Sequence, residues 1–176
     1  GSGSTAVYLL EARGGAQLNA WTIGEIGVWD VQFAPQGDLL AATFGGRSIS
    51  MISLASGQVL YSMATEEQGA PIAFSPAAPL FAIADGRAIS LYESASGDLV
   101  KSWETGADTE DLGSINALAF LPDGKSLVSG SGGRGLNVAL RLWDVESGAE
   151  LWSQRTAHSY GIDSIAVSPD GQSLAA

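Results

Sequence analysis

Two sequence landmarks recur along this chain at a nearly constant spacing, and this recurrence constrains the fold more than any other feature. The first is a turn in which an aromatic or aliphatic residue is soon followed by proline. Its prolines are 41, 46 and 47 residues apart, at Pro35, Pro76, Pro122 and Pro169. The second is a turn that ends in glycine, with glycines 42, 40 and 51 residues apart, at Gly15, Gly57, Gly97 and Gly148. Two independent landmarks with one period indicate a repeat architecture.

The third repeat shows the expected elements most clearly. Pro122-Asp123-Gly124 is a turn, since proline fixes φ, aspartate can bond the following backbone and glycine accepts a positive φ. Short apolar segments joined by such turns predict antiparallel strands, four in each repeat. The expected strands are 6–10 and 18–21, then 28–33, 39–43, 49–54 and 59–63, then 72–74, 80–84, 89–93 and 99–103, then 115–120, 126–129, 138–145 and 150–154, and finally 162–167 and 173–176.

The third repeat also carries Leu142-Trp143-Asp144, and Ala157-His158 follows, four residues before Ile162. With these residues and turns, the chain resembles the WD-repeat β-propeller family. The resemblance implies an all-β fold, a β-propeller of four-stranded antiparallel blades around a central channel, with four repeats in this chain. The other repeats depart from the Trp-Asp motif and have Leu10-Glu11, Ile52-Ser53 and Tyr92-Glu93 in its place.

The order of the expected strands divides one blade between the two ends of the chain. The C-terminal segment supplies its first two strands, a and b, and the N-terminal segment supplies its last two, c and d. Because unpaired strand edges promote aggregation, we expect the two halves to pair. Our hypothesis is that two copies exchange these strands and form a two-fold homodimer with an eight-bladed ring. A compact four-bladed monomer and a piece of a larger propeller are the alternatives.

Composition narrows the classes of function. The net charge of −11 disfavours nucleic acid and anionic membrane surfaces as partners. The absence of cysteine excludes disulfides and thiol chemistry and is compatible with a cytoplasmic protein, which we expect. No apolar segment approaches the roughly 20 residues of a membrane helix. Residues 1–4, Gly-Ser-Gly-Ser, resemble an added linker, and residues 5–176 are expected to form a single propeller domain or half of one.

We expect recognition at the end of the blades that carries the d–a and b–c loops, here called the top face, because loops on a rigid scaffold usually carry binding. An exposed tryptophan beside arginine is typical of a protein or peptide interface. The candidate residues are Trp29, Asp30, Arg47, Arg87, Asn116, Arg134 and Asp163. Alternatively, the arginines serve their own turns and the tryptophan packs on a neighbouring loop.

The resemblance assigns structural roles to Ser129, Trp143, Asp144 and His158. In the family, a histidine, a serine or threonine, an aspartate and the motif tryptophan form a hydrogen-bond network. Here the network is incomplete, because the repeat of His158 has Leu10 in the tryptophan position, and the third repeat has no histidine. As the only histidine, His158 has no evident partner for catalysis.

The remaining motifs indicate no cofactor and no metal. The glycine-rich segment 130–135 lacks the lysine of a phosphate-binding loop and joins two strands. The acidic residues of 104–111 lack a shaped cage for calcium. The sequence therefore predicts a non-catalytic interaction scaffold that self-associates into a closed propeller. The alternatives are an engineered or excised fragment whose only activity is self-assembly and, less favoured, a propeller enzyme or small-ligand binder.

Overall fold

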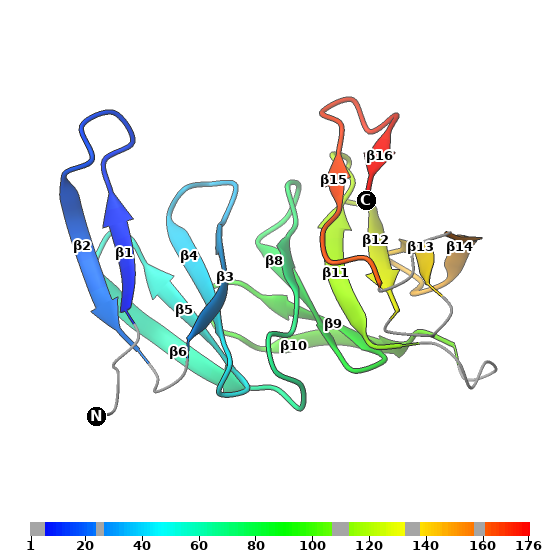
Figure 1. Cartoon of the computed structure of the whole chain (residues 1–176), viewed down its shortest axis with the longest axis horizontal. Helices are drawn as coiled ribbons and strands as arrows, with labels where there is room; N and C mark the ends of the chain where they lie inside the picture. The colour runs from blue at the N-terminus through cyan, green and yellow to red at the C-terminus, as the bar shows by residue number, and fades with distance from the viewer. Residues whose placement is uncertain (1–5, 24–26, 107–112, 133–137, 157–160) are drawn as a thin grey trace. The chain divides into compact units, whose positions relative to one another are not determined.

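The computed structural model describes residues 6–23, 27–106, 113–132, 138–156 and 161–176. These residues form sixteen β-strands in five sheets, and all strand pairs are antiparallel (Figure 1). The chain divides into two compact units, Gly1–Gly69 (unit 1) and Ala70–Ala176 (unit 2). The fold is thus all-β and built from repeated four-stranded sheets, as the sequence predicts.

Unit 1 contains one four-stranded sheet and one two-stranded sheet. The four-stranded sheet has the order β3 (Val28–Phe33), β4 (Leu39–Phe44), β5 (Ser48–Ser53) and β6 (Gln58–Ala64). The two-stranded sheet pairs β1 (Ala6–Leu10) with β2 (Gln17–Thr22). Val7 and Trp21 of this small sheet share a buried apolar cluster with Leu40 and Ile52 of the larger one. The indole Nε1 of Trp21 also donates a hydrogen bond to the carbonyl oxygen of Gly57 at 2.8 Å.

Unit 2 contains two four-stranded sheets and one two-stranded sheet. The first is β7 (Ile72–Phe74), β8 (Leu80–Asp85), β9 (Ala88–Glu93) and β10 (Leu99–Glu104). The second is β11 (Ile115–Phe120), β12 (Ser126–Ser131), β13 (Ala139–Asp144) and β14 (Glu150–Arg155). The small sheet pairs β15 (Ala166–Val167) with β16 (Leu174–Ala175).

The core of unit 2 lies between its two large sheets. Leu118, Phe120 and Trp143 of the second sheet share one buried cluster with Ala73 and Ala82 of the first. The segment before β15 contributes to a separate cluster, where Ile162 is buried with Ala117 and Val138. Large side chains pack against small ones here, which brings the neighbouring sheets close together. Each large apolar side chain buried in this way contributes about 1.5–3 kcal/mol to the free energy of folding.

Most of the expected strands begin and end within two residues of the observed ones. The exception is the expected strand 162–167, of which only Ala166–Val167 is formed. Its expected partner 173–176 agrees with the observed Leu174–Ala175 within one residue at each end. The prediction of a strand over residues 162–165 is therefore wrong.

The recurring glycine turns have a common backbone reason. The turn glycines after the third strand of each repeat have φ angles of 69°, 67°, 76° and 77°, at Gly15, Gly57, Gly97 and Gly148. Only glycine adopts this left-handed conformation without strain, so the repeat places glycine there. In each turn the glycine N–H donates to the carbonyl of the residue four positions earlier, at 2.8–2.9 Å.

The last strand of each of these repeats carries a β-bulge at the same place. In the ladder of β5 and β6, for example, Met51 is opposite Tyr61 and Ile52 is opposite Val59, so Leu60 has no partner. The equivalent unpaired residues on β2, β10 and β14 are likewise aliphatic and exposed. The four bulged residues are Leu18, Leu60, Val100 and Leu151, with exposed fractions of 62%, 46%, 53% and 54%.

Candidate interaction surfaces

In unit 1, the first strand of the large sheet carries a bulge that directs Trp29 away from the ladder. Val28 is opposite Phe44 and Asp30 is opposite Thr43, so Trp29 is the extra residue. Its side chain is 63% exposed. One face of the indole lies on Gly69, where an added Cβ would be 2.7 Å from Trp29 Cε3. Trp29 thus combines an exposed apolar surface with a fixed position.

The neighbouring residues Asp30 and Arg47 differ in how their side chains are used. The Asp30 carboxylate accepts hydrogen bonds from Val31 N at 2.8 Å and Gln32 Nε2 at 3.1 Å. Arg47 lies in the turn between β4 and β5 with a φ angle of 58°, and its side chain is exposed. Its carbonyl oxygen accepts from Thr65 N at 2.9 Å. Asp30 therefore stabilises its own strand, whereas the guanidinium of Arg47 is presented at the surface.

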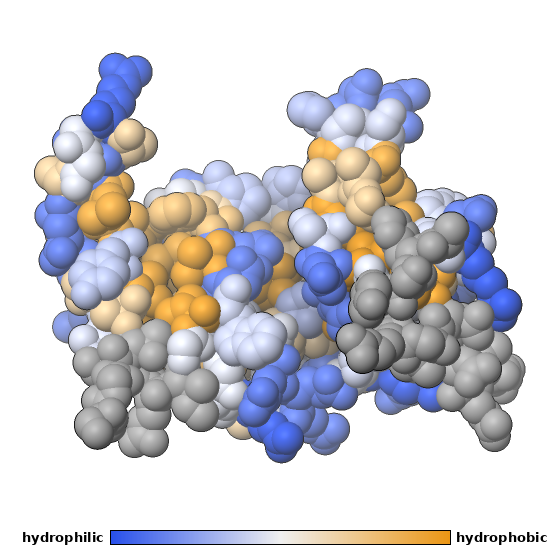
Figure 2. Space-filling view, in the orientation of Figure 1, coloured by the Kyte–Doolittle hydropathy of each residue, from blue (hydrophilic) through white to orange (hydrophobic). Residues whose placement is uncertain are grey.

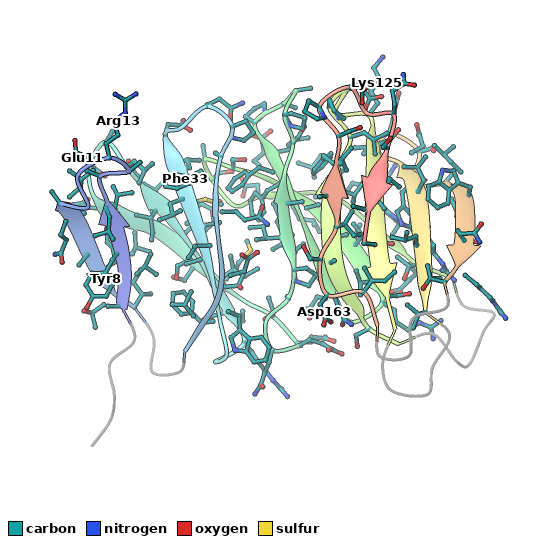
Figure 3. All side chains as sticks on the ribbon, turned by 45° about the horizontal axis from the view of Figure 1, so that its top comes forward. Tyr8, Glu11, Arg13, Phe33, Lys125 and Asp163 are labelled. Carbon is teal, nitrogen blue, oxygen red and sulfur yellow. The ribbon has the colours of Figure 1, made fainter. Side chains whose placement is uncertain are left out.

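In unit 2, Arg87 and Asn116 lie at one end of the sheets, and both bind backbone carbonyls. The guanidinium of Arg87 donates to Gly106 O, and Asn116 Nδ2 donates to Gly132 O at 3.0 Å. Ile115 N donates to Gly86 O at 3.2 Å, which joins the β8–β9 turn to the start of β11. Asp163 is exposed in the segment before β15 (Figure 3). Arg134 and His158 lie outside the described residues.

The residues with expected structural roles in the third repeat are close together. Trp143 and Ser129 are 3% and 1% exposed, and Trp143 Nε1 donates to Ser129 Oγ at 2.9 Å. Asp144 begins the turn after β13 and accepts from both the N–H and the hydroxyl of Ser147, at 2.7 and 2.5 Å. The hydroxyl bond, more than the backbone bond, lowers the pKa of the Asp144 carboxyl below its ordinary value, because both bonds favour the charged form.

Sequence reasoning missed Arg141, which lies in the middle of β13. Its Nη1 donates to Thr105 O at 2.5 Å and is 3.6 Å from a carboxylate oxygen of Glu150. The neighbouring carbonyl, that of Gly106, accepts from Arg87. Two guanidinium groups therefore bind successive carbonyls where β10 ends. The signal was an arginine between Leu140 and Leu142, at a position where the equivalent strands β5 and β9 have serine.

Sequence reasoning also missed two exposed apolar surfaces in unit 1. On β3, Val31 and Phe33 are 47% and 56% exposed (the β3 face). On β1, Tyr8 and Leu10 are 60% and 53% exposed (the β1 face). Figure 2 shows apolar residues gathered over β1 and beside β3, and Figure 3 labels Tyr8 and Phe33 on these strands. The alternation of side chains along a strand indicates which face these residues lie on. It does not indicate their exposure, because a complete four-stranded blade packed on its neighbour would bury them.

The described residues offer no evident site for metal chemistry. Among them, no three or more His, Cys, Asp or Glu side chains gather in a way that could hold a metal ion. A search of the same residues for a helix long and apolar enough to span a membrane also finds none.

Comparison with known proteins agrees with this repeat structure. Residues 106–138 match the family model "WD domain, G-beta repeat". The chain is 30% identical over 146 residues to an uncharacterised WD repeat-containing protein of Synechocystis, which covers 80% of this chain and 38% of that protein. It is 43% identical over 49 residues to WD repeat-containing protein 62 of Sus scrofa, over 28% of this chain and 3% of that protein. The chain thus spans much less than half the length of these relatives.

Among solved structures, hydrazine synthase of Kuenenia stuttgartiensis has a similar fold. The TM-score is 0.71 with 20% sequence identity, over 84% of this chain and 40% of the other. At this identity the likeness concerns the fold alone. The matched repeat, the WD-repeat relatives and the recurring four-stranded sheets together show that the chain is similar to proteins of the WD-repeat family.

Proposed function

We propose that this chain is a non-catalytic protein-interaction scaffold that self-associates. The observation that carries the proposal is the exposure of Tyr8, Leu10, Val31 and Phe33 on two strands of unit 1. Contiguous exposed apolar side chains on an ordered scaffold mark interaction surfaces. Similarity to WD-repeat proteins supports an interaction role. The proposal includes a cytoplasmic location and one propeller ring of eight blades completed by a second copy.

Mass in solution tests the self-association. We expect light scattering on a sizing column to give twice 18.0 kDa, with a mass that falls on dilution only near the dissociation constant. A mass of 18.0 kDa at every concentration would contradict this part of the proposal. The variant Phe33→Ser, on the β3 face, should lower this mass. Leu60→Ser is its matched control, because Leu60 is a similarly exposed apolar residue on the bulge of β6 and lies on neither the β1 face nor the β3 face.

The proposal also gives the top face a protein or peptide partner. In unit 1, Trp29 and Arg47 present an exposed indole and an exposed guanidinium, which are the groups enriched at interface hot spots. In unit 2, Arg87 and Asn116 hold the loops in place, and Asp163 is exposed. Arg134 belongs to the same proposed set.

A displayed peptide library tests the top face even though the partner is unidentified. Selected peptides should bind the chain and lose at least about tenfold in affinity with Trp29→Ala plus Arg47→Ala, since a hot-spot residue contributes 2 kcal/mol or more. The stability of the double variant should fall little if these side chains only bind. If no peptide is enriched while the mass is doubled, self-assembly is the only activity that remains supported.

A further inference from the structure

The turn between β4 and β5 holds an arginine in a backbone conformation that favours glycine. Phe44 and Ser48 are opposite each other in the ladder, so the turn consists of Gly45, Gly46 and Arg47. Arg47, with a φ of 58°, is the only residue other than glycine with a positive φ in the part of the chain that the structure describes. The last position of a three-residue hairpin loop is commonly left-handed and suits glycine, because a Cβ atom is strained there.

The same turn has glycine at positions that do not require it. Neither Gly45 nor Gly46 has a positive φ. A Cβ atom added to Gly46 would also meet nothing within 4 Å. The sequence therefore places glycine where a side chain would fit and arginine where glycine would be the less strained residue. The stability of the turn alone does not account for Arg47.

The side chain of Arg47 makes no contact within the fold that would offset this strain. It is exposed, and no hydrogen bond or ion pair joins its guanidinium to another described residue. Its carbonyl oxygen accepts from Thr65 N at 2.9 Å, which a glycine carbonyl would do equally well. Backbone strain that the surrounding structure does not explain is an indication of function.

The arginine of the corresponding turn in unit 2 has a different role. In the turn between β8 and β9, Gly86 takes the positive φ, of 64°, and Arg87 follows it. The guanidinium of Arg87 donates to the carbonyl oxygen of Gly106. Arg87 therefore stabilises its own loops without backbone strain, whereas Arg47 is strained and makes no such bond.

Trp29 lies at the same end of the sheet as Arg47. Val28 is opposite Phe44, so Trp29 and the β4–β5 turn are both next to this pair. The segment 65–69 contacts both residues, because Thr65 binds the Arg47 carbonyl and Gly69 lies against the Trp29 indole. The indole is 63% exposed. An exposed guanidinium and an exposed indole are therefore held at one end of the sheet by one segment.

We propose that Arg47 binds an oxyanion of the top-face partner, on a residue that is followed or preceded by an apolar residue packed on Trp29. The inference rests on the proposed peptide partner and names the chemistry by which it is recognised. A guanidinium presents a planar fork of N–H donors that matches a carboxylate or a phosphate. Only a residue with a side chain can present this charge from the turn, which accounts for the absence of glycine at position 47.

The stability of Arg47 variants tests whether the side chain serves the fold. Arg47→Ala removes the guanidinium but keeps the strain, so its melting temperature should stay within about 2 °C of the wild type. Arg47→Gly also relieves the strain and should melt roughly 2–4 °C above Arg47→Ala. A fall of more than about 4 °C with Arg47→Ala would show a structural role and overturn the inference.

Peptides selected from a displayed random library test the binding role. We expect them to share an aspartate or glutamate beside an apolar residue. Arg47→Ala and Arg47→Gly should weaken binding roughly tenfold or more, and so should the amide counterpart of the peptide acid. The two changes combined should cost little more than one, because they remove the same contact. The matched control is Arg13→Ala, which removes an exposed arginine from the β1–β2 turn and should leave the affinity unchanged (Figure 3).

The source of the oxyanion and the failure of the inference have separate readouts. A peptide with phosphoserine in place of the selected acid should bind more tightly if the site suits a phosphate and more weakly if it suits a carboxylate. Peptides that need Trp29 but bind Arg47→Ala as well as the wild type would overturn this inference and leave the proposed peptide partner intact. If no peptide is enriched, the proposed partner and this inference both fail.

Discussion

Removal of one hydroxyl group in unit 2 tests the packing of the third repeat. Ser129→Ala deletes the acceptor of the Trp143 indole N–H, a bond of 2.9 Å between side chains that are 1% and 3% exposed. A buried donor that loses its acceptor costs about 1–3 kcal/mol, because water cannot replace the partner. We expect a loss of about 2 kcal/mol in the free energy of unfolding and a fall of roughly 8 °C in melting temperature.

The assay is urea unfolding followed by circular dichroism and by tryptophan fluorescence, whose transitions should coincide for the unit to be treated as two-state. In the background Trp143→Phe, which has no N–H to satisfy, Ser129→Ala should cost less than about 0.5 kcal/mol. Trp103→Phe is the matched control, because Trp103 Nε1 is buried without a hydrogen-bond partner among the described residues. In the Trp103→Phe background, Ser129→Ala should cost as much as in the wild-type protein. An equal loss in the wild-type and Trp143→Phe backgrounds would refute the reasoning, since the cost would then not arise from the Trp143 indole.

Three further predictions concern local conformation and titration. Gly69→Ala should destabilise unit 1 by about 1–3 kcal/mol in thermal melts, because φ is 66° and the added Cβ would be 2.7 Å from Trp29. Gly37→Ala is the control, with a φ of 74° and open space around the added Cβ, and should cost only the backbone strain of about 1 kcal/mol. The pKa of the Asp144 carboxyl is lowered from 3.8 on folding, so this group stabilises the fold above pH 3.8, and that stability is lost as the pH falls through the folded pKa. Asp144→Asn should therefore flatten the acid limb of a stability–pH curve. An unchanged limb would contradict the role of the hydrogen bonds to Asp144. Burial raises the pKa of Tyr61 from 10.0 to about 12, so stability should decline between these pH values, and ultraviolet titration should show one tyrosine ionising late that is absent in Tyr61→Phe.

The turn chemistry made most of the fold predictable from the sequence. Glycine and proline at fixed intervals located the ends of nearly every strand, because few other residues satisfy those backbone angles. Of the expected strand 162–167, only Ala166–Val167 pairs with β16. A sequence pattern reports the preference of one strand, whereas a ladder needs two.

The candidate site was less predictable than the fold. The sequence analysis singled out Trp29 as a tryptophan in a top-face segment with arginine nearby, and the structure places it on a bulge. Its contact with Gly69, forty residues further on, left no local signal. The exposure of Phe33 was also beyond sequence reasoning, because Phe74 and Phe120 occupy the same position and are buried. The difference is made by the neighbouring sheet and not by the residue itself.

The bulges on β2, β6, β10 and β14 bear on how this protein behaves at high concentration. A chain made almost wholly of short strands presents a hydrogen-bonding edge on the last strand of every sheet, and such edges can template fibres. At each of these edges the ladder shifts by one residue beside the turn, so a straight incoming strand cannot stay in register along the whole edge. These four strand edges are thereby protected against fibrillisation, even though each bulge exposes an aliphatic side chain.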